Sequence, residues 1–375
     1  MAKVTDQRCR SLLEALDKIV GVRVVACEVE VPFDSEGRRA YIDHLVRARL
    51  GEDERETALA IESMDTVYPR DAQKLVERFA ARAWSLDGVD EVPLVVASHL
   101  SDGAQKVLRD GRVNFFHAAS GTMYFRHRQR HIDIQRPTSE PLERKIRSVF
   151  NGAREQVVHA LLVHRRWEGG KAWVSGTDLA EMAGTSPFTV STTLQELERQ
   201  AWIEVTGSGP TLRRRLSRPE LLLDAWADAW KRRLPKEPRS RWYAYAGGGG
   251  GIIDYMLERL AGFEGWALTG AGAANAVVPH LTPFDRATII VPPGLSKEWG
   301  AKFGLEPADK GANVTFIERT GAALMFGDSH PERPGSRFAS PFVMYLDLLD
   351  GVGRNKELAA EFRSRALQLG EATNG

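Results

Sequence analysis

One stretch of the chain, from Arg144 to Leu216, constrains the fold more than any other, because helical and extended patterns alternate in it over short distances. Apolar residues recur there at the spacing of a helix face or of a strand. The expected order is helix, short extended segment, helix, helix, and then two strands, over residues 144–162, 173–174, 179–183, 187–200, 202–205 and 211–216. Gly184 suits the end of the second helix and Pro187 the first turn of the third, with Thr177 or Asp178 and Thr185 or Ser186 as caps.

This order resembles the winged helix-turn-helix superfamily, and we assign residues 142–218 to such a domain. In that fold the second helix of the pair lies in the major groove and the hairpin, or wing, follows the backbone. Polar side chains that can bond bases or phosphates lie on the expected recognition helix. They are Ser186, Thr189, Ser191, Thr192 and Gln195. The expected wing carries Arg213, Arg214 and Arg215 for phosphates or the minor groove. The alternative is a protein-binding scaffold in which the winged helix contacts no DNA.

Charge is spread unevenly along the chain. The whole sequence has 51 Lys and Arg against 50 Asp and Glu, a net charge of +1. From Thr211 to Arg241, however, there are ten basic and four acidic residues. A local cationic surface is what contact with phosphates requires, so this stretch favours double-stranded DNA as the partner.

Two stretches rich in proline divide the chain further. Residues 136–141 and 234–240 are expected as linkers, and Gly247–Gly251 as a flexible hinge. We therefore predict three parts: an α/β domain over 1–136, the winged helix over 142–218, and a second α/β domain over 241–375. The fold class is multidomain, α/β and α+β, since strands and helices alternate on both sides of the winged helix.

The N-terminal part resembles the PD-(D/E)XK restriction-endonuclease-like fold. Asp43 lies in an expected strand, and Glu62 ends the next one before a helix that begins at Pro69. In that fold the two carboxylates share a divalent metal, which takes oxygen ligands, and a lysine two residues after the glutamate assists water. Met64 stands in the place of that lysine and offers neither charge nor proton. We therefore expect a domain without activity or bound metal. The alternative is a metal-dependent DNA nuclease that uses Asp43 and Glu62.

The chain from about Arg144 to the C-terminus resembles the AbiEi antitoxins of type IV toxin–antitoxin systems, which have a winged helix ahead of an α/β domain. The resemblance rests on three segments, namely Leu-Thr-Gly-Ala-Gly-Ala-Ala at 268–274, a strand at 287–291, and Gly-Arg-Asn-Lys-Glu at 353–357 before a last helix. It implies a transcriptional repressor of its own operon, with a nucleotidyltransferase toxin as partner. No catalytic residue transfers with the resemblance, because the antitoxin is not the enzyme.

Several motifs and segments that would indicate other kinds of protein are not found in the sequence. Neither glycine run completes a phosphate-binding motif, and Gly270 and Gly272 suit close packing of a helix on a strand. Cys9 and Cys27 are too few and too far apart in sequence for a disulfide framework or a zinc site. No apolar run is long enough for a membrane span, and no signal sequence is evident. We expect a cytoplasmic protein without cofactor, and a homodimer if the operator is palindromic.

Overall fold

The computed structural model describes residues 6–35, 38–52, 55–80, 90–136, 149–169, 172–246, 251–279, 286–330, 333–350 and 355–370. The chain forms two compact units. One comprises residues 1–146 with the short segment 196–201, and the other residues 147–195 with 202–375. Residues 137–141 of the predicted linker at 136–141, and most of the predicted hinge at 247–251, lie outside the described residues.

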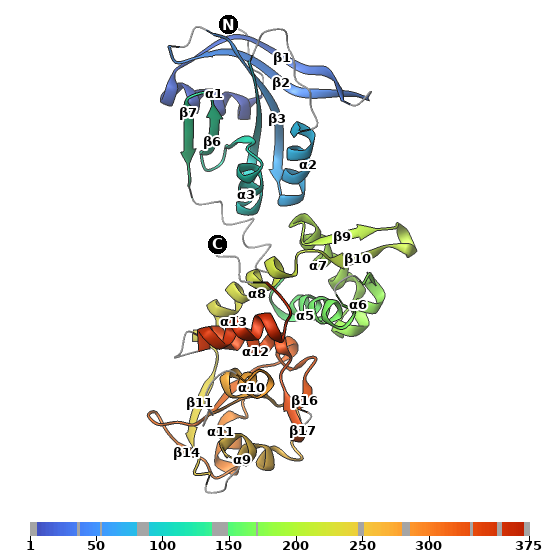
Figure 1. Ribbon diagram of the computed structural model, residues 1–375, viewed down its shortest axis with the longest axis vertical. Coiled ribbons are helices and arrows are strands. Elements are labelled where there is room, and N and C mark those ends of the chain that lie inside the picture. Colours follow the sequence, from blue (N-terminus) through green and yellow to red (C-terminus); the bar gives the residue numbers. More distant parts are fainter. Residues whose placement is uncertain are drawn as a thin grey trace. The chain divides into compact units, whose positions relative to one another are not determined.

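The first unit is built on a seven-stranded mixed sheet whose strands follow one another in chain order (Figure 1). The strands are β1 (Val22–Ser35), β2 (Arg38–Leu50), β3 (Thr57–Val67), β4 (Asp90–Leu100), β5 (Asn114–His117), β6 (Thr122–His127) and β7 (Arg130–Ile134). The pairs β3–β4 and β4–β5 are parallel and the others antiparallel. The helices are α1 (Gln7–Val20), α2 (Pro69–Ala80) and α3 (Asp102–Asp110).

Helices cover both faces of this sheet. Cys9, Leu12 and Leu16 of α1 pack on alternate residues of the strands in one apolar cluster. The residues between them face the other way and pack with α2 and α3 in a second cluster. This alternation is what two buried sheet faces require. The expected α/β class of this part is confirmed, whereas the endonuclease-like fold stays a prediction.

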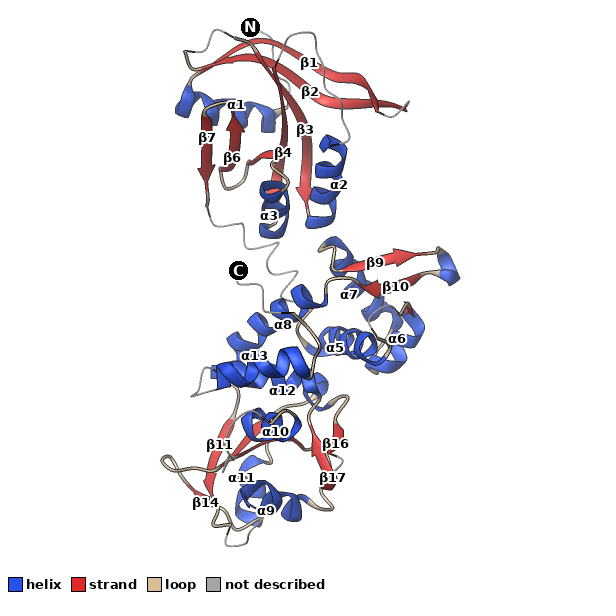
Figure 2. Ribbon diagram, in the orientation of Figure 1, coloured by secondary structure: helices blue, strands red, loops and turns tan. Residues whose placement is uncertain are grey.

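The winged-helix elements of the second unit follow the predicted order. They are α5 (Gly152–Trp167), β8 (Val174–Ser175), α6 (Gly176–Ala183), α7 (Pro187–Arg199), β9 (Ile203–Thr206) and β10 (Arg213–Leu216). Strand β10 lies between β8 and β9 in a small antiparallel sheet (Figure 2). Gly184 ends α6 in the left-handed conformation, as predicted. The cap of α6 differs from the prediction, because the Ser175 hydroxyl accepts the Asp178 amide N–H and neither Thr177 nor Asp178 is the cap.

The remainder of this unit is a second seven-stranded mixed sheet with helices. In spatial order the strands are β14 (Glu306–Pro307), β11 (Arg239–Tyr243), β15 (Val314–Glu318), β13 (Ala287–Val291), β12 (Ala267–Thr269), β17 (Arg333–Phe338) and β16 (Asp328–His330). Pairs β13–β15 and β12–β17 are parallel. The helical elements are α8 (Pro219–Arg233), η2 (Leu234–Lys236), α9 (Gly251–Leu260), α10 (Gly270–Val277), α11 (Ser296–Lys302), η3 (Gly321–Leu324), α12 (Pro341–Asp347), η4 (Leu348–Asp350) and α13 (Asn355–Arg365), besides the short η1 (Gly209–Thr211) in the wing.

The segment 234–240, predicted as a linker, is part of the packed structure. Leu234 is buried, the Glu237 carboxylate pairs with Arg319, and β11 begins at Arg239. The expectation was wrong because Pro235 and Pro238 end the helix and lead into a strand, and do not mark a free connection. Gly272 behaves as predicted, since a Cβ there would lie 2.5 Å from the Arg286 carbonyl oxygen.

The helices α5 and α8 are joined to the C-terminal sheet elements by buried polar contacts. His159 of α5 lies 2.9 Å from the Ala322 carbonyl oxygen through Nδ1 and 2.6 Å from Ser340 Oγ through Nε2. Trp230 of α8 donates from Nε1 to Asp347, whose carboxylate also pairs with Arg319. Arg363 of α13 pairs with Asp224 of α8. Winged helix and C-terminal sheet are therefore one packed body within this unit.

Among the described helices, none is long and apolar enough to cross a membrane.

Candidate nucleic-acid interface

The predicted recognition helix is α7, and its first turn is held by local hydrogen bonds. Ser186 Oγ accepts the Thr189 amide N–H at 3.1 Å and lies 2.9 Å from Thr189 Oγ1. Thr192 Oγ1 donates to the Thr189 carbonyl oxygen at 3.1 Å. Ser186 and Gln195 are exposed, and Thr189, Ser191 and Thr192 are half-buried. The five predicted polar side chains thus belong to one accessible helix, two of them engaged in its own cap.

One residue of this helix was missed by the sequence reasoning. Phe188 is 77% exposed, the second position of α7, immediately after Pro187. Single exposed apolar side chains are common on protein surfaces, but this one lies at the start of the proposed recognition helix and is therefore a candidate contact position. The sequence does contain a signal for this exposure, because helical spacing puts Phe188 outside the buried stripe of Val190, Leu194 and Leu197.

The three wing arginines have different surroundings. Arg213 Nη1 donates to the carbonyl oxygens of Pro210 and Leu212, at 3.2 and 3.3 Å. Arg215 pairs with Glu204 on the neighbouring strand, and its guanidinium carbon lies 4.8 Å from the centre of the Trp173 ring. Arg214 points to the other face of β10, and its buried Nε has no hydrogen-bond partner among the described residues. Within the described residues no hydrogen bond or ion pair holds Arg214, whereas Arg213 and Arg215 each have at least one.

A hollow joins the recognition helix to the wing. Its volume is about 230 Å³. Its lining comes from β8 and α6, from the start of α7, and from the wing, and includes Ser175, Gly176, Pro187, Ser191, Pro210 and Arg214. The structure therefore brings Ser191 and the wing arginines Arg213 and Arg214 to one concave surface.

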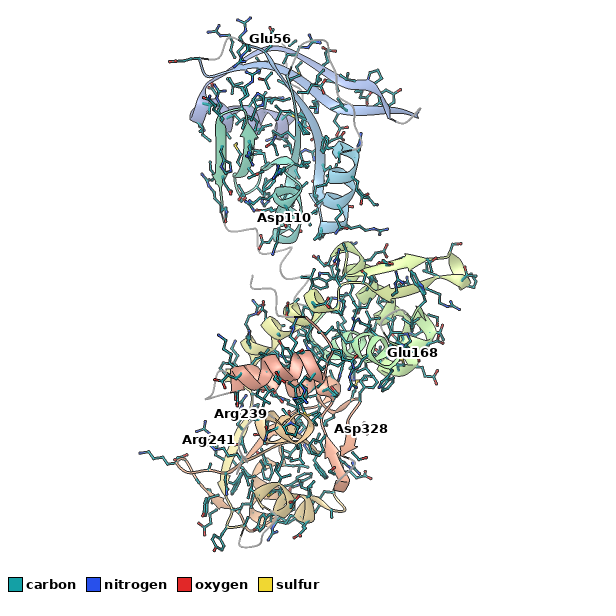
Figure 3. All side chains as sticks on the ribbon, in the orientation of Figure 1. Glu56, Asp110, Glu168, Arg239, Arg241 and Asp328 are labelled. Atoms are coloured by element: carbon teal, nitrogen blue, oxygen red, sulfur yellow. The ribbon has the colours of Figure 1, made fainter. Side chains whose placement is uncertain are left out.

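The basic stretch 211–241 does not form one surface. Only its first part lies in the wing, while Arg233 pairs with Glu155 at 2.5 Å and Lys231 approaches Asp228 at 3.9 Å in α8. Arg239 and Arg241, labelled in Figure 3, come from β11 and line a separate cavity of about 410 Å³ beside α10. The charge count overstated the cationic surface available to DNA, because it took no account of pairing.

The carboxylates predicted for a degenerate metal site in the first unit are both engaged. Asp43 Oδ2 accepts the Ser63 amide N–H at 2.8 Å. Glu62, which is 5% exposed, has Oε1 2.9 Å from Arg78 Nη2. Met64, in the lysine position, is half-buried against the cluster formed with α2 and α3. Neither carboxylate belongs to a group of three or more metal-ligating side chains within the described part of the chain.

Two family models match the chain, and both lie in the part that holds the winged helix and the second sheet. Residues 155–222 match the Crp-like helix-turn-helix domain. Residues 215–368 match the family described as transcriptional regulator, AbiEi antitoxin, type IV toxin–antitoxin system. No curated protein and no solved structure matches the chain.

The first match begins in α5 and ends in α8, so it covers the recognition helix and the wing. The second begins in β10 and ends after α13, so it covers the second sheet. The first family is described as a helix-turn-helix domain and the second as a transcriptional regulator and antitoxin. The chain is a DNA-binding transcriptional regulator, the antitoxin of a type IV toxin–antitoxin system.

Proposed function

We propose that the protein represses its own operon by placing the first turns of α7 in the major groove and the wing against the adjacent backbone. The observation that carries this proposal is the hollow shared by Ser191, Arg213 and Arg214. A helix in the major groove contacts base edges with its N-terminal residues, which here are Ser186, Thr189, Ser191, Thr192 and Gln195.

The wing has the role of positioning. Arg214 lines the hollow beside Ser191, and no hydrogen bond or ion pair holds it within the described residues. Its guanidinium can therefore donate charge-assisted hydrogen bonds to a phosphate oxygen. Phosphate contacts fix the orientation of a protein on the duplex, while sequence is read by the helix. Arg213 and Arg215 supply further positive charge beside it.

Binding to the promoter upstream of the gene, measured by fluorescence anisotropy at two salt concentrations, tests the proposal. We expect tight binding that weakens steeply as salt rises, since released counterions accompany each phosphate contact. The variant Arg213→Ala/Arg214→Ala/Arg215→Ala should bind weakly. A matched control is Arg365→Ala, which removes an exposed charge from α13. Equal loss in both variants, or no binding by the wild type, would refute the proposal.

A protein-binding role for the winged helix is the second candidate, and exposed Phe188 favours it. An aromatic side chain at an exposed position is a common anchor in protein interfaces. The two candidates differ in their salt response, because an apolar anchor is insensitive to ionic strength. Phe188→Ala should leave the salt dependence of promoter binding unchanged if the proposed repression is right.

The finer points of the antitoxin role are also proposals. We propose that the part of the chain with the second sheet counteracts a nucleotidyltransferase toxin, because the antitoxin match covers residues 215–368. The protein would act there by binding or regulation, without catalysis of its own. A homodimer is expected on a palindromic operator, and light scattering with and without promoter DNA would establish the stoichiometry.

A further inference from the structure

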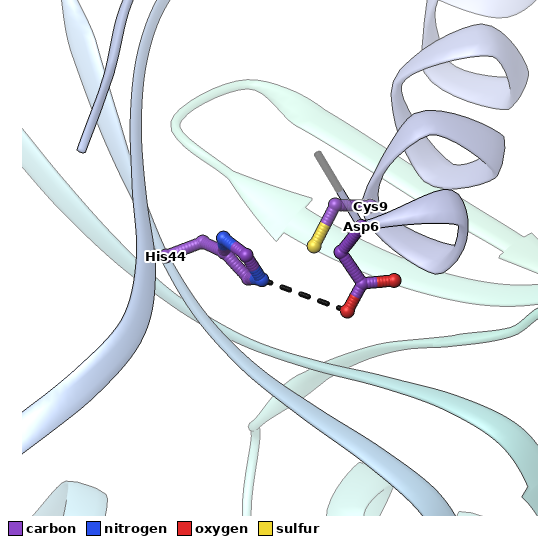
Figure 4. Close-up of side chains that lie close together, drawn as sticks. All are labelled: Asp6, Cys9 and His44. Atoms are coloured by element: carbon purple, nitrogen blue, oxygen red, sulfur yellow. Dashed lines mark ion pairs between the residues drawn. The ribbon is translucent and has the colours of Figure 1, made fainter. Parts of the chain in front are cut away.

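Three side chains with different ligand atoms meet beside the first helix of the chain. They are Asp6, Cys9 and His44, shown in Figure 4. The carboxylate oxygen, the thiol sulfur and the imidazole nitrogen all lie within 4.8 Å of one another. In the described part of the chain this is the one group of at least three such residues.

The fold explains how Cys9 and His44, which are 35 positions apart in the sequence, come together with Asp6. Asp6 is the N-cap of α1, and its Oδ1 accepts the Arg8 amide N–H at 2.7 Å. Cys9 is the third residue of α1, so it lies one turn further along the same helix. His44 projects from β2 on the sheet face that α1 covers, next to the cluster of Cys9 and Val46.

The imidazole of His44 is poorly satisfied for a buried polar group. His44 is 7% exposed, and Nδ1 has no hydrogen-bond partner among the described residues. Its Nε2 lies 3.5 Å from Asp6 Oδ2, at the limit of a hydrogen bond. That carboxylate oxygen already accepts a hydrogen bond from Ser63 Oγ at 2.5 Å. Buried polar groups are normally bonded, whereas His44 lacks a partner at Nδ1 and has only a long contact at Nε2, the nitrogen that faces Asp6.

We propose that Asp6, Cys9 and His44 bind one zinc ion. Thiolate, imidazole and carboxylate are the ligands that zinc takes, and the softness of sulfur and nitrogen disfavours magnesium and calcium. Two ligands carrying one negative charge each would neutralise a divalent ion. Cys9 coordinates as the thiolate, so its proton leaves to solvent when the ion binds.

The distances suit this ion after a small adjustment. Bond lengths of about 2.3 Å to sulfur and about 2.0 Å to nitrogen, at a tetrahedral angle, put these two ligand atoms about 3.5 Å apart. Ligand atoms that lie within 4.8 Å of one another must approach by about 1 Å, which side-chain rotation can supply. Cys9 is fully buried, whereas the Asp6 side chain is 16% exposed. Asp6 therefore gives an ion a route from solvent, and a water molecule can take the fourth position.

This proposal corrects the sequence expectation that the chain has too few cysteines for zinc. Two cysteines far apart in sequence do exclude a site built on a short Cys-x-x-Cys spacing. They do not exclude a site with one cysteine, whose partners are an N-cap residue and a strand residue. The proposal is independent of DNA binding, since its three residues lie in the first unit.

Titration of the untagged full-length protein with cobalt(II), a spectroscopic substitute for zinc, tests the proposal. We expect one ion per chain and an intense thiolate-to-cobalt charge-transfer band in the near ultraviolet, both displaced by zinc. Cys9→Ser should abolish the band and His44→Gln should weaken binding at least tenfold. The matched control Cys27→Ser should keep the band.

The control also decides the case in which Cys9→Ser fails to fold. The chain has only two cysteines, so in Cys27→Ser any thiolate band must arise from Cys9. Retention of the band in Cys27→Ser, together with a rise in the melting temperature on addition of zinc, supports the site. Absence of the band in the wild type, or its loss in Cys27→Ser, overturns it.

Discussion

Arginines serve opposite purposes in two regions of the second unit. In the wing, Arg213, Arg214 and Arg215 lie on a short exposed hairpin, and Arg214 Nε has no partner among the described residues. Between α8 and the second sheet, Arg319 is 7% exposed. It is held by Asp347 at 2.8 Å and by Glu237 at 2.7 Å. We propose that the same kind of side chain binds an external anion in the wing, whereas Arg319 fixes the packing beside the second sheet.

If the wing binds DNA as proposed, the presence of carboxylate partners and not the number of arginines determines which surface is available to DNA. When a guanidinium pairs with a buried carboxylate, its charge is neutralised there. A guanidinium that lies beside a hollow without a carboxylate partner can still attract phosphate. The following predictions test this division, first at the buried contacts and then at the wing.

The largest effect is expected from Arg319→Met. The change leaves the Asp347 carboxylate without its cation and Glu237 with only Arg239, at 3.5 Å, and breaking a buried pair in this way costs about 3–5 kcal/mol. Chemical denaturation followed by tryptophan fluorescence would report it, since Arg319 also stacks 4.7 Å from the Trp230 ring. Arg365→Met, at an exposed pair with Glu361, should cost less than about 0.5 kcal/mol. Similar losses for both variants would break the comparison.

His159 predicts a pH dependence of the same buried region. Burial lowers its pKa from 6.5 to about 3, although a hydrogen bond with Ala322 acts in the opposite sense. Because the Ala322 carbonyl oxygen can only accept, Nδ1 carries the proton and Nε2 accepts from the Ser340 hydroxyl. The neutral imidazole of His159 is therefore the form that can make both hydrogen bonds.

The sign of the effect follows from the lowered pKa. Below pH 6.5 the unfolded chain takes up a proton at this residue that the folded chain refuses. Its contribution to stability is complete above pH 6.5 and is lost as the pH falls towards 3, by at most about 1.4 kcal/mol per pH unit. His159→Gln should flatten the fall between pH 7 and pH 5, while His164→Gln, also on α5, should not. An unchanged slope in His159→Gln would contradict the assignment of the neutral imidazole.

At the wing, Arg214→Ala should account for most of the loss seen in the triple variant. We expect about tenfold weaker promoter binding and a salt slope smaller by about 1, as for one lost phosphate contact. Arg215→Ala should cost less, because its guanidinium already pairs with Glu204. Anisotropy titrations at several salt concentrations would rank the two, and a larger loss for Arg215→Ala would reverse the assignment.

The winged helix was predictable because its determinants are local. Gly184 and Pro187 mark a helix end and a helix start within a few residues, and the apolar spacing identifies the buried stripe of α7. The strands 287–291 and 314–318 were found for the same reason, as short apolar runs. These signals need no knowledge of the rest of the chain.

The partners of charged side chains were not predictable, because they come from distant positions. Arg319 meets Glu237 across 82 residues, and Arg363 meets Asp224 across 139. The helix α8 was missed within a stretch considered only for its charge, although Trp226 and Trp230 lie buried at helical spacing in it. Only tertiary packing shows which basic residues of 211–241 have a carboxylate partner and which do not.

The smallest effect is expected in the first unit, from Asp43→Asn combined with Glu62→Gln. Glu62 is paired with Arg78, Asp43 accepts the Ser63 amide, and Met64 supplies no proton. Carboxylates held in this way do not provide the open oxygen ligands that a nuclease metal needs. We expect promoter affinity to stay within twofold of the wild type, and no cleavage of plasmid DNA by either protein with magnesium or manganese. Cleavage by the wild type that disappears in the double variant would establish the nuclease alternative. It would also show that the pairing of Glu62 with Arg78 opens to admit a metal.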